Sequence, residues 1–333
     1  YIKNQKTKNA QSVKTLKTRH KLALTGTPIE NSLAELWSIF DFLMPQYLFN
    51  YHYFQKQYES SIVKNNDEEK TKQLKKLVTP FILRRNKKEV LKELPDKIEQ
   101  NMILPFSDEE EKIYVANLAK VNEELQQLYD IEGSDKMQIL KMLTRLRQLC
   151  LEPRLVYDNI DQPSSKLKAC MELIKTMQEN KQKVLLFSSF TSALDLIAEE
   201  CQKAGITYYM LTGSTNKEER RELVSRFQKD DTTLFLISLK AGGTGLNLTS
   251  AENVIHYDPW WNVSAQNQAT DRAYRIGQKS NVQVFNLVMK DSVEEKIIEM
   301  QKRKKELADM VVENNSGGLS HMSKEDILSL FTM

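Results

Sequence analysis

The sequence predicts an α/β protein in which helices cover both faces of a parallel sheet, joined to an added helical insertion. From residue 165 onward, helical patterns alternate with short apolar runs, as in parallel sheets whose strands are buried on both faces. Upstream of residue 165, apolar residues recur mostly at helical spacing. A chain of 333 residues is long enough for two domains with separate hydrophobic cores.

Composition and charge limit the kinds of function that the chain can have. Hydrophobic residues make up 40% of the chain and charged residues 28%, a balance typical of a soluble, folded protein. No apolar run approaches the roughly 18 residues that a membrane-spanning helix needs, so we expect no membrane partner. The net charge of +3 does not by itself indicate nucleic acid. Two basic clusters give modest evidence for a phosphate-backbone ligand: Lys3, Lys6, Lys8, Lys14, Lys17, Arg19 and Lys21, then Arg84, Arg85, Lys87, Lys88 and Lys92.

The three cysteines, Cys150, Cys170 and Cys201, lie far apart and show no spacing typical of a metal site. We therefore expect no metal bound by these residues and free thiols in a reducing compartment, either the cytoplasm with its nucleoid or the nucleus. The chain begins Tyr-Ile-Lys-Asn, without a starting Met or a signal peptide, and we expect it to be a fragment of a longer protein.

The first 45 residues predict one strand and one helix. The apolar run Lys21–Leu24 predicts a short strand, and the sequence Thr25-Gly26-Thr27-Pro28 predicts a tight turn after it. Ser32 and Glu35 have the spacing of a capping box that starts the next helix. That helix directs its apolar residues to a core: Leu33, Leu36, Trp37, Phe40 and Leu43.

Residues 46–164 predict helices rather than a sheet. An aromatic group near the start is expected to pack a helical insertion rather than to stack on bases: Tyr47, Phe49, Tyr51, Tyr53, Phe54 and Tyr58. Ser107 and Glu110 have capping-box spacing, and a long amphipathic helix follows them. Gly133-Ser134 separates it from a second amphipathic helix that ends near Leu149. We interpret this pair as a helical protrusion without catalytic chemistry.

The regular part of the chain predicts helices at 166–180, 191–204, 216–229 and 291–312, and a short one at 323–331. Strands are predicted at 184–188, 208–211, 234–238, 254–257 and 282–288, each a short apolar run. Parallel strands place their carboxyl ends at one edge of the sheet, where α/β proteins bind ligands.

The stretch from Leu236 to Gln278 carries the strongest chemical signal. Lys240-Ala-Gly-Gly-Thr-Gly245 follows a strand, and its three glycines allow a tight turn that leaves backbone amides open to a phosphate. After the next strand, Gln268, Arg272 and Arg275 are spaced to share one face of a predicted helix that Gly277 ends. Two guanidinium groups near a glycine-rich turn suit the charge of a transferring γ-phosphoryl group, although most such faces are simply solvated.

Several stretches resemble ordered motifs of the SWI/SNF-type, chromatin-remodeller-like DNA translocases of helicase superfamily 2. LTGTPIEN at residues 24–31 is similar to motif III, and QATDRAYRIGQ at residues 268–278 is similar to motif VI and is the most specific match. LRQLCLEPRL at residues 146–155 resembles a landmark ahead of the family's second lobe. The resemblance runs from about Leu22 to near Leu307 and implies a RecA-like lobe of the P-loop NTPase type.

The resemblance also implies roles for individual residues. Gln268, Arg272 and Arg275 would be catalytic, with the two arginines as arginine fingers, and Gly245 and Asn247 would lie near the nucleotide. Residues that would contact the DNA backbone are Ser188, Ser189, Thr191, Gly213, Ser214, Thr215, Lys240, Gly242 and Gly243. Residues that would couple the two sites are Thr25, Gly26, Thr27, Trp261 and Asn262. Thr212 stands where the family usually has Asp, which puts that position's role in doubt. Arg84 and Arg85 lie in a segment similar to the one that closes the first lobe.

No GxxxxGK[ST] sequence occurs in the chain, and no DExx run precedes the motif III stretch. We therefore expect the second half of a two-lobed motor, inactive alone, that uses ATP and Mg²⁺ bound mainly by a missing first lobe. Its partners would be that lobe, double-stranded DNA and a DNA-bound protein substrate. The expected segments are the end of the first lobe (1–48), a helical insertion with the closing segment of that lobe (49–105), a protrusion (106–164), a complete second lobe (165–290) and a brace helix with a tail (291–333).

Two other functions fit parts of the sequence. A non-catalytic DNA- or protein-binding module could retain the helicase fold, but it would have no need of Gln268, Arg272 and Arg275 together. A nucleotide-sugar transferase could share the α/β sheet and the glycine-rich turn, but it does not account for the order of the motifs. The cellular process is open, because remodelling, polymerase recycling and repair would all use this motor.

Overall fold

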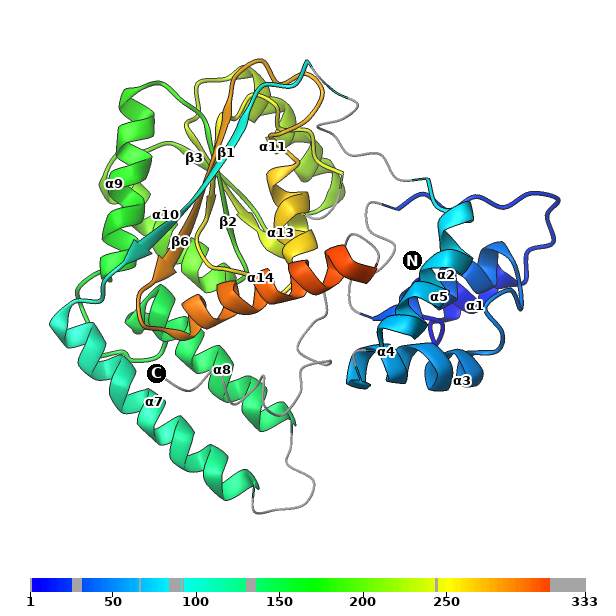
Figure 1. Cartoon of the computed structure of the whole chain (residues 1–333). Coiled ribbons are helices and arrows are strands. Elements are labelled where there is room, and N and C mark those ends of the chain that lie inside the picture. Colours follow the sequence, from blue (N-terminus) through cyan, green and yellow to red (C-terminus); the bar gives the residue numbers. More distant parts are fainter. Residues whose placement is uncertain are drawn as a thin grey trace. The chain divides into compact units, whose positions relative to one another are not determined.

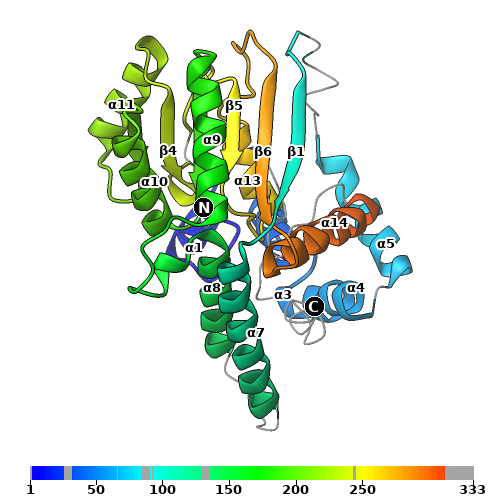
Figure 2. The same ribbon diagram turned by 90° about the vertical axis from the view of Figure 1, so that its left-hand side faces the viewer.

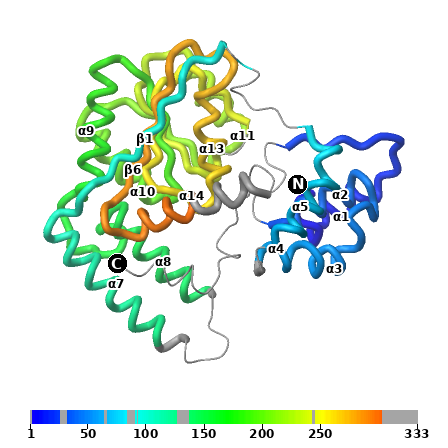
Figure 3. Tube along the Cα trace, in the orientation of Figure 1, coloured from blue at the N-terminus to red at the C-terminus, as the bar shows by residue number. Residues whose placement is uncertain are grey.

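The computed structural model describes residues 2–25, 32–65, 67–83, 91, 93–129, 136–242 and 245–311. It divides into two compact units. The first unit comprises residues 1–90, 261–264 and 300–323, and the second comprises residues 91–260, 265–299 and 324–333. Figure 1 shows the elements by label, and Figure 3 traces the chain from end to end. Within the described ranges, no helix is long and apolar enough to cross a membrane.

The first unit is helical in its described part. Its elements are α1 (Lys8–Lys14), α2 (Leu33–Leu43), α3 (Tyr51–Phe54), the π-helical turn η1 (Gln55–Glu59), α4 (Ser60–Asn65), α5 (Glu68–Val78) and the 3₁₀ turn η2 (Thr79–Phe81). Aromatic rings hold these helices together, as the sequence predicts. The Trp37 and Tyr51 ring centroids lie 5.2 Å apart, and those of Phe54 and Tyr58 lie 5.6 Å apart.

Two predictions for the first unit are wrong. Lys21–Leu24 does not form a strand, and the Leu22 and Leu24 side chains are 91% and 102% exposed. A strand needs a neighbouring strand for its amide and carbonyl groups, and the described residues of this unit supply none. The Ser32 side chain makes no capping bond, because the Glu35 amide donates to the Ser32 carbonyl instead, at 3.1 Å.

The second unit contains a six-stranded parallel sheet with strand order β1-β6-β5-β2-β4-β3. The strands are β1 (Lys97–Leu104), β2 (Val184–Ser188), β3 (Tyr208–Leu211), β4 (Leu234–Ser238), β5 (Asn253–His256) and β6 (Val282–Met289). Every residue of the central strands β2, β4 and β5 is buried, as a parallel sheet covered on both faces requires. The predicted α/β fold class is confirmed.

Helices cover both faces of this sheet (Figure 1). One face packs α9 (Ser165–Glu179) and α10 (Thr191–Lys203) on alternate strand residues such as Leu186 and Leu236. The other face packs α11 (Lys217–Lys229), α12 (Leu239–Gly242) and α13 (Val263–Thr270) on the intervening residues, such as Phe187 and Phe235. This alternation follows from the two-residue period of a strand.

Strand β1 differs from the sequence-based expectation for its segment, which places residues 49–105 in an insertion and the closing part of the first lobe. In the structure, Lys97–Leu104 pairs in parallel with Val282–Met289 along its full length and forms an edge of the second unit's sheet. Its polar residues explain why the sequence predicts no strand here: an edge strand keeps one side in solvent, and five of its eight residues are exposed.

Two helices form a hairpin that leaves the carboxyl edge of the sheet (Figure 2). They are α7 (Asp108–Tyr129) and α8 (Lys136–Leu151), and the 3₁₀ turn η3 (Pro153–Leu155) follows them. The predicted capping box at the start of α7 is present, since the Ser107 amide donates to Glu110 Oε2 at 2.8 Å and the Glu110 amide to Ser107 Oγ at 3.4 Å. Past β6, α14 (Val293–Val311) matches the predicted helix 291–312, and the predicted helix 323–331 lies outside the described residues.

A buried histidine at the end of β5 makes the stability of the second unit sensitive to acid. His256 Nε2 lies 2.9 Å from Thr270 Oγ1, and its ring stacks on Phe187 at 5.7 Å. Burial lowers the pKa of His256 from 6.5 to about 4. Between pH 6.5 and about 4, His256 is protonated in the unfolded chain but neutral in the folded one. The free energy of unfolding is therefore highest above pH 6.5 and decreases as the pH falls toward 4.

We expect His256→Gln to flatten this pH dependence. The wild type should lose about 3 kcal/mol more than the variant in its free energy of unfolding between neutral pH and pH 4, because its neutral imidazole must charge. Denaturant unfolding at several pH values measures this difference, and His52→Gln, at an exposed position, is the control. Parallel curves for wild type and His256→Gln would show that His256 titrates normally.

Candidate functional site at the carboxyl edge of the sheet

The predicted site residues of the second unit come together at one edge of the sheet. Because all six strands are parallel, the turns that follow β5, β2, β4 and β3 lie side by side in that order at the carboxyl edge. Ser188 ends β2 and Ser189 follows it, residues 213–215 follow β3, and Lys240 follows β4. The edge therefore gathers hydroxyl groups, backbone amides and the Lys240 cation from segments far apart in the sequence.

The turn after β3 is closed by hydroxyl groups. The Thr212 amide donates to Thr215 Oγ1 at 3.1 Å, and Thr212 Oγ1 lies 2.8 Å from Ser214 Oγ. Gly213 and Ser214 are exposed at its tip. Thr212, which stands where the resembling family usually has Asp, thus helps to shape the turn. A turn with exposed hydroxyl and amide groups beside the first turn of a helix is suited to hold a phosphate.

The turn after β4 combines a fixed backbone with an exposed cation. A Cβ atom at Gly242 would lie 2.8 Å from Phe187 Cε1, so only glycine lets α12 pack this closely against β2. Lys240, Gly245 and Asn247 are exposed, and Gly245 has a φ of +38°. Gly243 lies outside the described residues. The exposed groups are therefore carried on a backbone whose position is set by packing.

The predicted arginine helix ends before the arginines, which corrects the expected geometry. Helix α13 stops at Thr270, and Arg272 and Arg275 lie in successive turns rather than on one helical face with Gln268. The Arg272 carbonyl accepts a hydrogen bond from the Leu248 amide at 3.0 Å, whereas an α-helix would pair it with the amide four residues later. The chain is thereby tied back to the glycine-rich segment. Gln268 is partly exposed on the last turn of α13.

The two arginines differ in burial. Arg272 is partly buried, and its Nε donates to the Gly242 carbonyl at 2.9 Å. Burial lowers the pKa of Arg272 from its ordinary value, and the nearby charge of Arg275 adds to the effect. Arg275 is exposed, and no carboxylate of the described residues lies within ion-pair distance of it. Of the two guanidinium groups, that of Arg272 is held by a backbone carbonyl and that of Arg275 is open to a ligand.

Two of the predicted DNA-contact residues turn inward. Ser188 is 1% exposed, and its Oγ donates to Asp258 Oδ1 at 2.7 Å. The Ser189 amide donates to the same oxygen at 2.9 Å, and its hydroxyl donates to Asp258 Oδ2. The Ser188 side chain is therefore closed to a ligand here, whereas Thr191, at the start of α10, is exposed.

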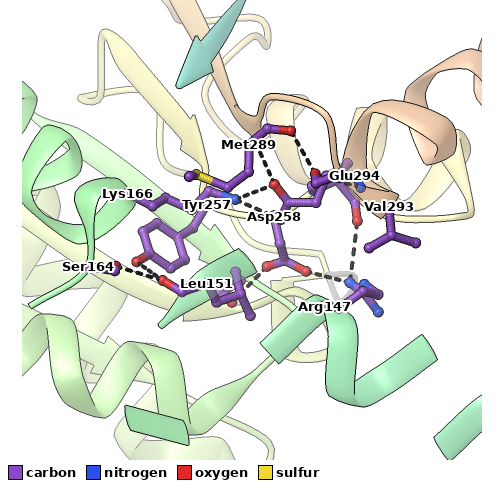
Figure 4. Close-up of polar contacts among 12 residues, drawn as sticks. Arg147, Leu151, Ser164, Lys166, Tyr257, Asp258, Met289, Val293 and Glu294 are labelled. Atoms are coloured by element: carbon purple, nitrogen blue, oxygen red, sulfur yellow. Dashed lines mark hydrogen bonds and ion pairs between the residues drawn. The ribbon is translucent and has the colours of Figure 1, made fainter. Parts of the chain in front are cut away.

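Sequence reasoning missed the residue that organises these turns. Arg147 of α8 is 5% exposed and forms an ion pair with Asp258 at 2.7 Å between Nη2 and Oδ2 (Figure 4). The signal that could have found it is a charged residue inside the apolar run of LRQLCLEPRL, because a buried charge requires a partner. An acidic residue directly after a buried strand, Asp258, is the matching signal.

The remaining predicted positions divide between the first unit and the residues that are not described. Thr25 is described, and Gly26, Thr27, Arg84 and Arg85 are not. Trp261 is buried and Asn262 partly exposed, and both group with the first unit. Among the described residues, no cluster of three His, Cys, Asp or Glu side chains could hold a metal ion. The cysteines are buried, and burial raises the pKa of Cys201 to about 12, so this thiol is unreactive.

The fold defines a class: a RecA-like α/β lobe of the helicase type, with a helical hairpin at its carboxyl edge. Two family descriptions match the chain, the SNF2-related domain over residues 1–155 and the helicase conserved C-terminal domain over residues 165–277. A solved structure of the Sulfolobus solfataricus SWI2/SNF2 ATPase core in complex with dsDNA is 34% identical, with a TM-score of 0.59, and the match covers 99% of this chain and 70% of that one. The chain belongs to the SNF2 family of helicase-related ATPases.

Curated relatives extend the comparison. The putative ATP-dependent helicase/translocase YwqA of Bacillus subtilis is 39% identical over 100% of this chain and 37% of its own length. The SWI/SNF-related matrix-associated actin-dependent regulator of chromatin subfamily A member 1 of Mus musculus is 34% identical over 99% of this chain and 33% of its own length. The chain thus spans about a third of the length of these relatives.

Proposed function

We propose that this chain is the second motor lobe of an ATP-dependent translocase that moves along double-stranded DNA. The observation that carries the proposal is the pair Arg272 and Arg275, because one guanidinium is tied to the Gly242 carbonyl and the other is exposed beside it. A positioned cation of this kind stabilises the charge that develops on a transferring γ-phosphoryl group. The similar Sulfolobus solfataricus core forms a complex with dsDNA, which supports duplex DNA as the track.

The chain's residues fit one side of a nucleotide site. Arg272 and Arg275 could bind γ-phosphate oxygens, with Gln268 close before them in the sequence. Gly245 and Asn247 precede Leu248, whose amide donates to the Arg272 carbonyl. The sequence has no GxxxxGK[ST] loop to hold the β- and γ-phosphates, and no DExx run before the motif III stretch to hold Mg²⁺. ATP with Mg²⁺ supplies the phosphoryl group and the energy of its hydrolysis. In this proposal a first lobe holds both, and the present chain orients and neutralises the γ-phosphate.

A second observation supports a missing complementary lobe. Leu22 and Leu24 are almost completely exposed, although they belong to an apolar run typical of a buried strand. Burying two leucines in a sheet would stabilise the assembly by about 3 kcal/mol or more. We infer that strands of the first lobe cover this run and form a sheet with it.

Contacts to DNA would be made mostly to phosphates. Exposed groups at the carboxyl edge are Thr191, Gly213, Ser214 and Lys240, with Thr215 partly exposed. Hydroxyl groups, backbone amides and a lysine bind phosphates without reading the base sequence, so we expect a weak sequence preference and a steep salt dependence. The protein would act inside the cell, in the cytoplasm or nucleus where duplex DNA is found, on that DNA or on a protein bound to it.

We expect the isolated chain to bind duplex DNA without hydrolysing ATP. Titration of a labelled duplex at several salt concentrations should give an affinity that falls as the salt concentration rises. For each phosphate contacted, the logarithm of the binding constant should fall by about 0.9 for every tenfold increase in salt. Phosphate release should match a protein-free blank, because the fingers lack a nucleotide to act on. Lys240→Ala should reduce the salt slope, and Lys203→Ala, at an exposed position on α10, is the control. DNA-stimulated ATPase activity of the chain alone would contradict the proposed division between lobes.

A further inference from the structure

Arg147 joins the helical hairpin to two turns at the carboxyl edge of the sheet. Its Nη2 donates to Asp258 Oδ2 at 2.7 Å (Figure 4). The same nitrogen donates to Ser189 Oγ at 3.0 Å and to the Pro259 carbonyl at 3.3 Å. Asp258 follows β5, and Ser189 follows the neighbouring strand β2. One side chain from α8 thus fixes two turns that belong to different strands.

The side chain is also held by aromatic rings. Its guanidinium carbon lies 4.9 Å from the ring centroid of Phe190 and 5.3 Å from that of Trp260. These rings come from the same two turns as the hydrogen-bond partners. A planar, delocalised guanidinium can contact rings and hydrogen-bond acceptors at the same time, which the compact ammonium of lysine cannot do.

Asp258 is the acidic partner of Arg147 and also binds the turn after β2. Besides its ion pair with Arg147, it accepts hydrogen bonds from Ser188 Oγ at 2.7 Å and from the Ser189 amide at 2.9 Å. Its side chain is 1% exposed. The two turns, residues 188–190 and 258–260, therefore share one buried pair of charges and cannot shift independently without separating it.

The hairpin that carries Arg147 is itself fastened to the sheet. The Tyr257 hydroxyl donates to the Leu151 carbonyl at 2.9 Å, and the Ser164 amide donates to Glu152 Oε2 at 2.9 Å. From the other helix of the hairpin, Tyr114 OH accepts from the Val293 amide at 2.8 Å. Arg147 therefore lies on a helix that is hydrogen-bonded to the rest of the second unit, rather than on a loop.

We propose that Arg147 is a positioning residue that sets the two turns at the spacing needed to grip DNA and to transmit the motor stroke. This inference rests on the proposed translocase function. The turn 188–190 leads directly into Thr191, an exposed candidate for DNA contact, and the turn 258–260 leads into Trp261 and Asn262, the candidate coupling pair. Arg147 does not touch the ligands. It acts through the turns that carry those residues.

The test compares Arg147→Lys with Arg145→Lys in the complete protein. Lysine at 147 retains a charge for Asp258, so the variant should fold, but it cannot keep all the contacts of the guanidinium. Arg145 lies two residues away on α8 and is exposed, and it donates to Asn117 Oδ1 and to the Tyr157 hydroxyl rather than to either turn. Arg147→Lys should raise the DNA concentration for half-maximal ATPase stimulation on the order of tenfold, the effect of losing a charge-assisted hydrogen bond. Arg145→Lys should leave it unchanged.

Amide hydrogen exchange supplies a readout that does not depend on motor activity. In Arg147→Lys, amide exchange should quicken at Ser189, Phe190, Asp258 and Trp260 but not in the strands β2 and β5. Unchanged exchange in the two turns, or faster exchange throughout the sheet, would overturn the inference, because Arg147 would then be irrelevant or merely structural. Normal DNA stimulation of Arg147→Lys would overturn it as well. If the wild type shows no DNA stimulation, the proposed function fails, and the exchange result alone decides whether Arg147 fixes the turns.

Discussion

Replacing Arg275 by alanine in the complete protein should lower kcat for DNA-stimulated ATP hydrolysis by about 10³- to 10⁵-fold, the range found for arginine fingers. Arg275 is exposed and has no ion-pair partner among the described residues, so its removal should not disturb the fold. KM for ATP should change far less than kcat, because the finger acts mainly on charge that develops in the transition state. Steady-state phosphate release at saturating DNA measures both parameters.

Two variants sharpen this test. Lys279→Ala removes another exposed cation four residues away and should retain the wild-type rate. Arg275→Lys keeps the charge but loses the planar fork, so it should remain strongly impaired if the guanidinium binds phosphate oxygens in pairs. A kcat for Arg275→Ala within a few-fold of wild type would show that Arg275 is not a finger.

Replacing Lys166 by methionine should destabilise the second unit by about 3–5 kcal/mol, the cost of leaving a buried charge without its partner. Lys166 and Glu294 are both completely buried and lie 2.7 Å apart between Nζ and Oε1 (Figure 4). The pair joins the first turn of α9 to the start of α14, and Glu294 Oε2 also accepts from the Met289 amide at 2.8 Å. Denaturant unfolding of the chain measures the loss.

The loss in free energy of unfolding caused by Lys166→Met should depend on pH in a defined direction. Burial already raises the pKa of Glu294, and Lys166 opposes that rise. Without Lys166 the pKa should rise further, so the folded variant binds a proton that the unfolded chain has released. Its stability is therefore greatest at low pH and falls as the pH rises through the folded pKa of Glu294. Relative to the wild type, the variant should therefore lose more free energy of unfolding at pH 8 than at pH 5.

Matched variants separate the buried charge from other effects. Lys166→Met combined with Glu294→Gln should regain much of the stability, because no charge remains and glutamine can still accept from the Met289 amide. Lys203→Met removes the cation of the Lys203–Glu200 pair on α10, whose lysine side chain is 64% exposed, and should cost less than about 1 kcal/mol. A Lys166→Met variant as stable as wild type at pH 8 would contradict this account of the pair.

The sequence was sufficient for the sheet and its helices where local pattern and burial agree. The predicted strand 184–188 matches β2 residue for residue, since a run of apolar residues between helices has few other solutions. Strand β1 escaped prediction because it is polar, lies at an edge and pairs with a segment about 185 residues later, as the hydrogen bond from Asn286 to Asn101 illustrates. Such pairing is decided by tertiary contacts that no local pattern records.

The site was predictable in its residue types and less so in its geometry. Spacings of four and three suggested one helical face for Gln268, Arg272 and Arg275. Helix α13 instead ends at Thr270, and the Arg272 carbonyl accepts from the Leu248 amide rather than from a later turn of a helix. The hydroxyl of Ser188 is a reasonable DNA-contact candidate from sequence, but in the structure it donates to the buried Asp258. Arg147 had no motif of its own, because its role comes from a contact 111 residues away in the sequence.

The structure of the complete protein with duplex DNA and a transition-state analogue of ATP tests the central claim most directly. We predict that the Arg275 guanidinium lies at hydrogen-bond distance, about 3 Å, from the γ-phosphate mimic held by the other lobe, with Arg272 beside it. A structure with the analogue fully bound and both guanidinium groups turned away from it would contradict the claim that this chain supplies the arginine fingers of a motor.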